Sequence, residues 1–432
     1  MELKKYKIGD LVQVTRGASL GGEFYATQGN KVRLTCGNFD YRNNCFKENQ
    51  SKDNIYYTGG FKEEFLLEKG DIITPLTEQA IGLLGSTARI PESGKYIQSQ
   101  DIAKIDCNES LLDKDFAFYL ISSACVKQQL SAAAQQTKIR HTSPDKIKEC
   151  TVWIPSLDIQ KRIGRILTDI DNKIAINRQI NDNLEAMAKQ LYDYWFVQFD
   201  FPNEEGKPYK SSGGAMVWNE KLKREIPQGW SDCVLSDYIG RITNGLNPRK
   251  NFVLGSGNNY YVTIRSLVGT TIDWNNCDRC DDEALSKINS RSQLQIGDII
   301  FSAIGTIGRT YYILEEPTNW NISETSFTLR AKENVPNDFF YGMLRSNEIQ
   351  IKADKAAMGS TLRCLVMDSL CSLQYIKIPS YMMKLFAAKV SPLYRQIHRN
   401  NKEIAELTKQ RDELLPLLMN GQASINYHLS DD

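Results

Sequence analysis

The stretch from Ile159 to Phe196 reads IQKRIGRILTDIDNKIAINRQINDNLEAMAKQLYDYWF. Its mostly apolar positions recur at alternating spacings of four and three, which is the a/d seam of a heptad helix. No proline lies between Pro155 and Pro202, and Gly164 is the only glycine there. Nothing in the stretch therefore ends a helix early. The predicted seam consists of Ile163, Leu167, Ile170, Ile174, Asn177, Asn181, Leu184, Ala188, Leu191 and Trp195.

The same spacing returns 223 residues later, because 386 − 163 and 418 − 195 give the same offset. The chain is therefore predicted to run globule, long helix, globule, long helix. We expect Pro392 to kink the second helix or mark a restart, and Pro416 to kink or end it. The second seam consists of Phe386, Val390, Leu393, Ile397, Asn400, Ile404, Leu407, Arg411, Leu414 and Leu418.

An internal repeat accompanies the two helices. The segment 68–73 (EKGDII) parallels 295–300 (QIGDII), and 153–156 (WIPS) parallels 377–380 (KIPS). If the two globules lie at opposite ends of the first helix, the second helix must run back to bury its seam. This predicts an α+β fold of two mixed, mostly β modules and an antiparallel coiled coil, related by a pseudo-twofold repeat. Asn177 and Asn400 occupy equivalent seam positions, where they either set the register or face solvent.

The predicted boundaries follow from these landmarks. A helix of about 33 residues is about 50 Å long at ~1.5 Å per residue, which suits a spacer between two modules. The segment 203–225 is rich in glycine, serine and mixed charge, so we expect a linker without a packed core. The expected parts are a first module 1–153, a helix 154–202, a linker 203–225, a second module 226–377, a helix 378–421 and a tail 422–432.

Composition limits the functional classes. The 432 residues carry 53 Lys and Arg against 52 Asp and Glu, so no global charge indicates a nucleic acid or a membrane. Ten cysteines lack framework spacing, and the start MELKK resembles no export signal, which favours a cytoplasmic chain with reduced thiols. No run approaches ~18 apolar residues, so no transmembrane span and no membrane partner is expected.

Catalytic and cofactor motifs are not found. The sequence has no phosphate-binding P-loop and no dinucleotide fingerprint after a strand. Its three histidines lie far apart, and Cys277 with Cys280 is a lone pair without a second pair at zinc-finger spacing. We therefore expect no catalytic residue, no metal, no cofactor and no enzymatic activity of the chain alone.

Polar and basic loops beside strands at matching places of the two modules are the candidate binding sites. Arg, Lys, Gln, Ser and Thr are the residues that read base edges and hold phosphates. For any single residue a solvated loop is the simpler interpretation, and Arg265, expected in a strand 261–267, could equally be a surface ion-pair partner. As matched sets they form a plausible DNA-binding face. The candidates are Thr77, Gln79, Lys138, Arg140, Arg265, Ser302, Arg309, Thr361 and Arg363.

Several segments together resemble the specificity subunits of type I restriction–modification systems. They are 194–200 (YWFVQFD), 206–214 (GKPYKSSGG), 224–230 (REIPQGW), 297–302 (GDIIFS), 305–308 (GTIG) and 411–421 (RDELLPLLMNG). The likeness covers nearly the whole chain, but the first module's 74–87 loop lacks the Gly-Thr-Ile-Gly turn of the second module. Because that family offers no short contact motif, the candidate residues above come from loop placement.

The resemblance implies a non-catalytic subunit with two target-recognition domains, each reading half of a bipartite, asymmetric site in double-stranded DNA. It further implies that the helices set the spacing of the half-sites. Two methyltransferase subunits would dock on the helices and methylate adenine, and motor–nuclease subunits would complete the restriction complex. The alternatives are a two-module protein-interaction scaffold with a coiled-coil spacer, and an enzyme whose site is hidden in a divergent module.

Overall fold

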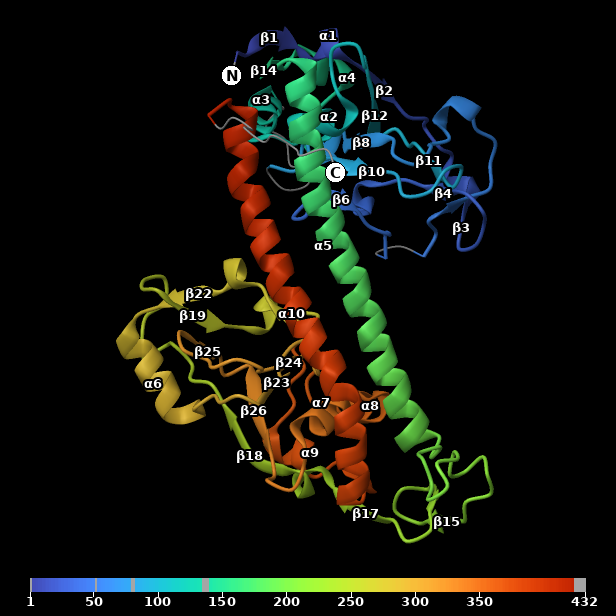
Figure 1. Ribbon diagram of the computed structural model, residues 1–432, viewed down its shortest axis with the longest axis vertical. Helices are drawn as coiled ribbons and strands as arrows, with labels where there is room; N and C mark the ends of the chain where they lie inside the picture. Colours follow the sequence, from blue (N-terminus) through green and yellow to red (C-terminus); the bar gives the residue numbers. More distant parts are fainter. Residues whose placement is uncertain (1, 51–52, 79–81, 134–139, 423–432) are drawn as a thin grey trace, which may run out of the picture. The chain divides into compact units, whose positions relative to one another are not determined.

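The computed structural model describes residues 2–50, 53–78, 82–133 and 140–422 (Figure 1). The chain divides into two compact units: unit 1 is Met1–Ala175 with Ala405–Asp432, and unit 2 is Ile176–Ile404. The division falls within both long helices, so each unit contains a part of each helix. Within the described residues, no helix is both long and apolar enough to cross a membrane.

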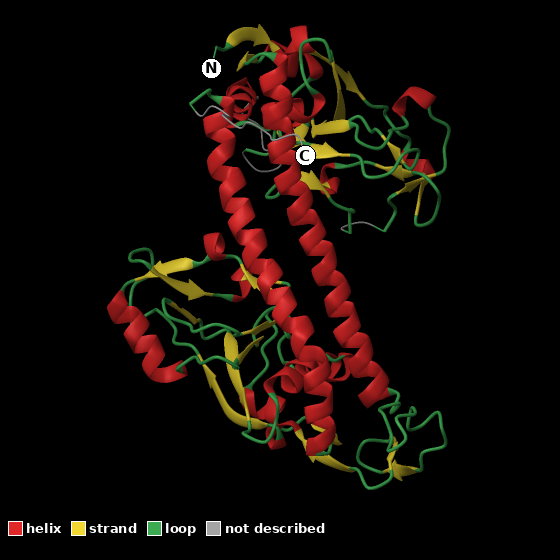
Figure 2. Ribbon diagram, in the orientation of Figure 1, coloured by secondary structure: helices red, strands yellow, loops and turns green. Residues whose placement is uncertain are grey.

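The two long helices are present as expected. Helix α5 spans Leu157–Tyr192 and continues into a π-helical turn, Asp193–Val197, and helix α10 spans Ser380–Met419 (Figure 2). In unit 1, α5 and the end of α10 contribute to a single hydrophobic core. In unit 2, the ring of Phe196 lies 5.2 Å from that of Phe386. The structure confirms the α+β class with two long helices.

The structure decides between the alternatives left open for the two prolines of the second helix. Helix α10 does not restart at Pro392 and does not end at Pro416, since it runs unbroken to Met419. A proline inside a helix removes one hydrogen bond and costs ~3 kcal/mol. Around Pro392 the apolar face is fully buried, with Phe386 and Val390 at 0% exposure. Burying such side chains is worth about 1.5–3 kcal/mol each, which offsets the cost of the proline.

The polar seam positions are buried and paired rather than solvated. In unit 2, Asn400 donates to Asn181 at 2.8 Å, and Asn177 donates to Glu403 at 2.8 Å. From Asn177 to Asn181 the residue number rises along α5, whereas that of the bonded residue on α10 falls from Glu403 to Asn400. The two helix segments of unit 2 therefore run antiparallel. Because a buried amide loses its partner when the register slips, these contacts favour the register role over the solvent-facing alternative.

A buried arginine occupies a further seam position, in unit 1. The Arg411 guanidinium is bonded to Asp171 at 2.8 Å, and the same carboxylate accepts a hydrogen bond from Tyr119 at 2.7 Å. Burial disfavours this charge, but the hydrogen bonds to Asp171 and Asp412 outweigh it and raise the pKa of Arg411. The residue therefore stays charged and pairs the two helix segments of unit 1.

Unit 1 is built around two four-stranded sheets, with strand orders β10-β8-β12-β2 and β11-β4-β7-β3. Two-stranded sheets β1-β14, β13-β9 and β5-β6 complete it. Its helices before α5 are α1 (Ile8–Leu11), α2 (Lys114–Ile121), α3 (Ala124–Ala133) and α4 (Pro144–Glu149). Its strands are β1 (Lys4–Lys7), β2 (Val12–Arg16), β3 (Tyr25–Ala26), β4 (Val32–Arg33), β5 (Phe39–Asp40), β6 (Cys45–Phe46), β7 (Tyr56–Tyr57), β8 (Ile72–Pro75), β9 (Thr77–Glu78), β10 (Ala88–Arg89), β11 (Tyr96–Ile97), β12 (Ile102–Cys107), β13 (Arg140–His141) and β14 (Thr151–Ile154).

Unit 2 repeats this plan. Its four-stranded sheet has the order β18-β26-β23-β24, its three-stranded sheet is β22-β19-β25, and its two-stranded sheets are β17-β27, β20-β21 and β15-β16. Its shorter helices are α6 (Asp282–Ser292), α7 (Asn337–Arg345), α8 (Asn347–Ala356) and α9 (Met367–Cys371). Its strands are β15 (Met216–Asn219), β16 (Arg224–Pro227), β17 (Ser231–Val234), β18 (Ile239–Asn244), β19 (Asn259–Val262), β20 (Leu267–Val268), β21 (Thr271–Ile272), β22 (Asp278–Cys280), β23 (Ile299–Ser302), β24 (Thr310–Tyr312), β25 (Trp320–Ile322), β26 (Ser326–Ala331) and β27 (Gln374–Lys377).

The correspondence between the modules extends to single turns. Asp71 caps the turn before β8 by accepting from the Glu68 amide at 2.9 Å, and Asp298 accepts from the Gln295 amide at 2.9 Å before β23. The buried Asp298 also binds Arg330 through two hydrogen bonds of 2.7 and 2.8 Å. These aspartates are turn-forming residues, as the Gly-Asp pattern predicts. The internal repeat is thus a duplicated fold.

The segment 203–225 differs from the sequence expectation, which gave it no packed core. It leads into a hairpin in which β15 pairs with β16, and Tyr209 stacks on Phe201 with ring centroids 4.8 Å apart. Met216 and Leu222 pack against the core of unit 2. Aromatic and apolar residues spaced through the polar segment supply this packing. The high glycine and serine content led the sequence analysis to expect a linker instead.

Helix α2 begins directly against helix α5, and a glycine permits this contact. A Cβ on Gly164 would lie 2.7 Å from the backbone nitrogen of Phe116 and 2.9 Å from the Asp113 carboxylate. Asp113 caps α2 by accepting from that same Phe116 amide at 2.9 Å. The single glycine of the first long helix is therefore required by packing. Residues 122–123 separate α2 from α3.

Candidate nucleic-acid interface

The turn between β23 and β24 in unit 2 is held by its own residues. The Ser302 hydroxyl donates to the Thr306 carbonyl at 2.6 Å and accepts from the Arg309 amide at 2.8 Å. Ser302 is fully buried. A Cβ on Gly308 would lie 2.0 Å from the Gln350 side chain, and φ there is +88°, so glycine is needed at this point. Ser302 therefore shapes the turn and does not present its hydroxyl to a ligand.

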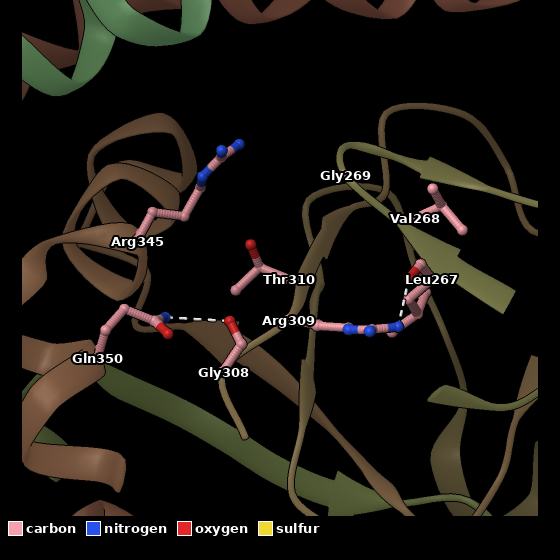
Figure 3. Close-up of a pocket in the computed structure, with 8 residues that line it drawn as sticks. All are labelled: Leu267, Val268, Gly269, Gly308, Arg309, Thr310, Arg345 and Gln350. Carbon is pink, nitrogen blue, oxygen red and sulfur yellow. Dashed lines mark hydrogen bonds between the residues drawn. The ribbon is translucent and has the colours of Figure 1, made fainter. Parts of the chain in front are cut away.

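Arg309 extends from this turn to the neighbouring hairpin β20-β21. Its guanidinium donates to the carbonyls of Ile264 and Leu267, each at 3.0 Å. Figure 3 shows the arginine lying along one side of a hollow that also includes Gly308, Thr310 and Gln350. Its side chain thereby ties two loops of the module together.

Arg345 lines the other side of the same hollow. It donates to the Tyr341 hydroxyl at 2.7 Å and to the Glu185 carboxylate at 2.6 Å. Burial works against this charge, whereas Tyr341 and Glu185 raise the pKa of Arg345 above its usual value. The hollow therefore contains two cations, Arg309 and Arg345, that are already engaged within unit 2.

The remaining candidates of unit 2 lie in adjoining turns. Arg363 binds Asp354 at 2.8 Å, and its carbonyl accepts from the Gly305 amide at 2.8 Å, which joins its loop to the β23-β24 turn. Thr361 lies exposed at the tip of the same loop. Arg265 lies in a 3₁₀ turn, Ile264–Ser266, and not in the strand expected there, because β19 ends at residue 262. Its side chain is 73% exposed and lies 3.9 Å from Asp278, the ion pair considered as its alternative role.

The candidates of unit 1 form a more buried arrangement. Arg140 and His141 form β13, which pairs with β9, so Arg140 lies opposite Glu78 and His141 opposite Thr77. The Arg140 guanidinium forms an ion pair with the fully buried Glu78 carboxylate at 3.2 Å and also bonds Ser131. Thr77 contacts the Cys36 sulfur at 3.0 Å. Gln79 and Lys138 lie outside the described residues.

Two exposed cations of unit 2 were not among the candidates predicted from the sequence. Arg249 and Lys250 follow Pro248 in the loop between β18 and β19, and within the described chain neither forms an ion pair. The adjacent Asn247 donates to Glu324 at 2.7 Å, which ties this loop to the segment beside β26. The signal was the run Pro-Arg-Lys within an Asn- and Gly-rich segment, which is typical of an exposed basic turn.

The described residues contain no group of three or more His, Cys, Asp and Glu side chains placed to bind a metal ion. Each of the ten cysteines is a free thiol in the structure. The candidate face of unit 2 thus consists of hydrogen-bonding and cationic side chains on short turns. Such a face suits recognition of a polar, anionic surface.

Comparison with known proteins identifies the class. Residues 1–186 match the family model described as the type I restriction modification DNA specificity domain. The MjaIX specificity subunit of Methanocaldococcus jannaschii is 26% identical over 356 residues, covering 80% of this chain and 78% of that protein. The HindI specificity subunit of Haemophilus influenzae is 23% identical over 470 residues, covering 97% of this chain and 99% of that protein.

A solved structure agrees with the fold. The crystal structure of a type I restriction–modification S subunit from M. genitalium superimposes with a TM-score of 0.56 at 16% identity, covering 97% of this chain and 96% of that chain. The similar proteins are named as specificity subunits of restriction enzymes, which supports the expectation of a non-catalytic chain. Residues 1–186 therefore contain a type I restriction modification DNA specificity domain, and over most of its length the chain is similar to the specificity subunits of type I restriction enzymes.

Proposed function

We propose that the chain reads a bipartite, asymmetric site in double-stranded DNA, each module recognising one half. The observation that carries this proposal is the duplicated strand order, β10-β8-β12-β2 in one module and β24-β23-β26-β18 in the other. The strands correspond, whereas the loops differ in length and sequence. A common scaffold with different loops is what two independent readers of different half-sites require.

In unit 2 the contacts of the candidate residues separate those proposed to touch DNA from those proposed to hold the turns in place. Arg265 and Thr361 are exposed and are proposed to contact DNA directly. Arg249 and Lys250 are proposed to hold phosphates, because free cations release counterions on binding DNA. Three further candidates are engaged within the module, and we propose that they hold the reading turns in place: Ser302, Arg309 and Arg363.

The unit 1 candidates are proposed to serve the first half-site. Arg140 is tied to Glu78, so its proposed part is to position the β9-β13 sheet beside the DNA. Thr77 lies on that sheet. Gln79 and Lys138 flank the same two strands in sequence and remain proposed contacts.

The remaining parts of the proposal concern assembly. We propose modules at 1–153 and 226–377, spacer helices at 154–202 and 378–421, a connecting segment at 203–225 and a tail at 422–432. Specificity subunits act within restriction–modification complexes. Two methyltransferase subunits are proposed to dock on the helices, and motor–nuclease subunits to complete the complex in the cytoplasm.

The test is a module exchange read by methylation. Cells expressing the chain with its methyltransferase partner are analysed by methylome sequencing, and residues 1–153 are then replaced by the first module of another family member. One half of the methylated motif should change while the other half and the spacer persist. A change in both halves, or in neither, from a folded and active chimera contradicts independent reading.

A further inference from the structure

The hairpin β20-β21 of unit 2 is held from two sides. On one side the Arg309 guanidinium donates to the Leu267 carbonyl at 3.0 Å. On the other side the Asn401 side-chain amide of helix α10 donates to the Thr270 hydroxyl at 3.3 Å and to the Thr270 carbonyl at 3.5 Å. The hairpin directly follows the 3₁₀ turn that carries Arg265. Helix α10 therefore takes part in placing a loop that is proposed to contact DNA.

Asn401 belongs to a chain of three side-chain amides that crosses from one long helix to the other. Asn400 donates to the buried Asn181 of α5, and Asn181 donates to the Asn401 oxygen, both at 2.8 Å. The Asn401 nitrogen then donates to Thr270. Asn181 and Asn401 each accept through the oxygen and donate through the nitrogen, so their neighbours fix the orientation of both amides. The position of the hairpin is thereby connected to the register of the two helix segments.

A stripe of α10 beside the seam carries these contacts with the module. Tyr394, His398 and Asn401 each directly follow a seam residue, so they lie along one side of the helix. The Tyr394 ring meets that of Tyr341 with a centroid distance of 4.9 Å, and the His398 Nε2 atom lies 3.2 Å from the Glu315 carboxylate. The stripe therefore holds the module against the helix at three successive levels.

The first long helix uses the equivalent position in unit 1. The offset of 223 residues relates Tyr394 to Asp171, since 394 − 223 = 171. Asp171 accepts a hydrogen bond from Tyr119 of α2 at 2.7 Å. Both helices thus bind their module through a residue that follows a seam position. The stripe is therefore a feature of the duplicated fold.

We propose that Asn401 is a positioning residue through which the chain selects one spacer length between the two half-sites. The inference rests on the proposed reading of a bipartite site. A spacer longer or shorter by one base pair displaces one half-site by ~3.4 Å and rotates it by about 35°. A module that follows this displacement moves relative to α10 and loses the bonds between Thr270 and Asn401. These bonds therefore penalise altered spacers, whereas at the native spacer they remain intact.

The test compares methylation rates of the full-length chain with its methyltransferase partner on duplexes that carry the methylome-defined half-sites. The spacer is native, one pair shorter or one pair longer. In Asn401→Ala we expect the ratio of the rate on an altered spacer to the rate on the native spacer to rise about fivefold. This corresponds to the roughly 1 kcal/mol that a hydrogen bond contributes, at 1.4 kcal/mol per factor of ten. The preferred half-site sequences should stay unchanged.

Thr270→Val and Thr271→Val form a matched pair in the hairpin. The Thr270 hydroxyl bonds the helix, whereas the Thr271 hydroxyl donates to the Val268 carbonyl at 3.0 Å within the hairpin. Thr270→Val should raise the same ratio and Thr271→Val should leave it unchanged. Adding Thr270→Val to Asn401→Ala should have no further effect, because both substitutions remove the same contact. Thr270→Val also tests the contact without disturbing the amide chain between the helices.

Three results would overturn the proposal. A lower rate at all three spacers with an unchanged ratio in Asn401→Ala and Thr270→Val would mean that the contact only stabilises the fold. An equal rise of the ratio in Thr271→Val would place the effect in the hairpin itself. Failure of the proposed function would give a distinguishable result, a wild-type rate that does not depend on the two half-sites, and would overturn the inference as well.

Discussion

The substitution Arg309→Ala distinguishes two roles for this residue: positioning a loop, or contacting DNA directly. In the structure the Arg309 guanidinium bonds the backbone carbonyls of Ile264 and Leu267 and therefore holds the turn that carries Arg265. Alanine removes both bonds, which join the turn to the β23-β24 loop. We expect weaker DNA binding without loss of the module's fold.

The magnitude follows from the two hydrogen bonds. A hydrogen bond to a charged group contributes about 1.5–3 kcal/mol when buried. One of these bonds is exposed and the other half-buried, so we expect about 2 kcal/mol for the pair. If the whole effect appears in binding, affinity falls about 30-fold, at 1.4 kcal/mol per factor of ten.

The assay is fluorescence anisotropy of the chain with its methyltransferase partner on labelled duplexes carrying the methylome-defined site, at several salt concentrations. A positioning residue weakens binding but leaves the dependence on log salt unchanged. The control is Arg249→Ala, because loss of a phosphate contact should weaken all sequences alike and reduce the salt slope by about 1.

Three results would refute this reasoning for Arg309. A salt slope reduced by about 1 in Arg309→Ala would make it a phosphate contact. A relaxed preference at one base position with unchanged salt slope and unchanged exchange in the Ile264–Ser266 turn would make it a base-reading residue. Unchanged affinity would remove this turn from the DNA-binding face altogether.

Three further predictions concern the helices. Asn400→Leu should leave the Asn181 amide oxygen without its donor, while the Asn181 nitrogen still donates to Asn401 at 2.8 Å. We expect this to destabilise unit 2 by about 1–3 kcal/mol, measured as a lower midpoint in calorimetry, with Asn181→Leu/Asn400→Leu closer to wild type. Arg411→Met should cost about 2–4 kcal/mol in unit 1 because Asp171 loses its cationic partner and keeps only the Tyr119 hydroxyl, and an undiminished melting temperature would contradict this. One heptad inserted into both helices at matching levels adds about 10 Å, or roughly three base pairs of spacer, which methylome sequencing detects. Methylation confined to the original spacer by a folded, active variant would contradict the spacer role.

Local patterns were sufficient to predict the architecture. The a/d spacing from Ile163 to Trp195 and its return at Phe386 determine which face of each helix is apolar, because helical periodicity is a property of neighbouring residues. The Gly-Asp turns before β8 and β23 likewise depend on bonds spanning three residues. Repeated together, these signals revealed the duplicated module, and the family resemblance supplied the DNA-binding role.

Only the tertiary structure decided what individual side chains do. The carbonyl partners of Arg309 lie 42 and 45 residues away in sequence, and no local pattern predicts which backbone oxygen a guanidinium will meet. The same holds for the buried carboxylate opposite Arg140. Pro392 remains inside α10 because burial of distant core residues outweighs a local penalty. Local periodicity thus determines the elements, whereas contacts between remote segments determine which polar groups are left to bind a ligand.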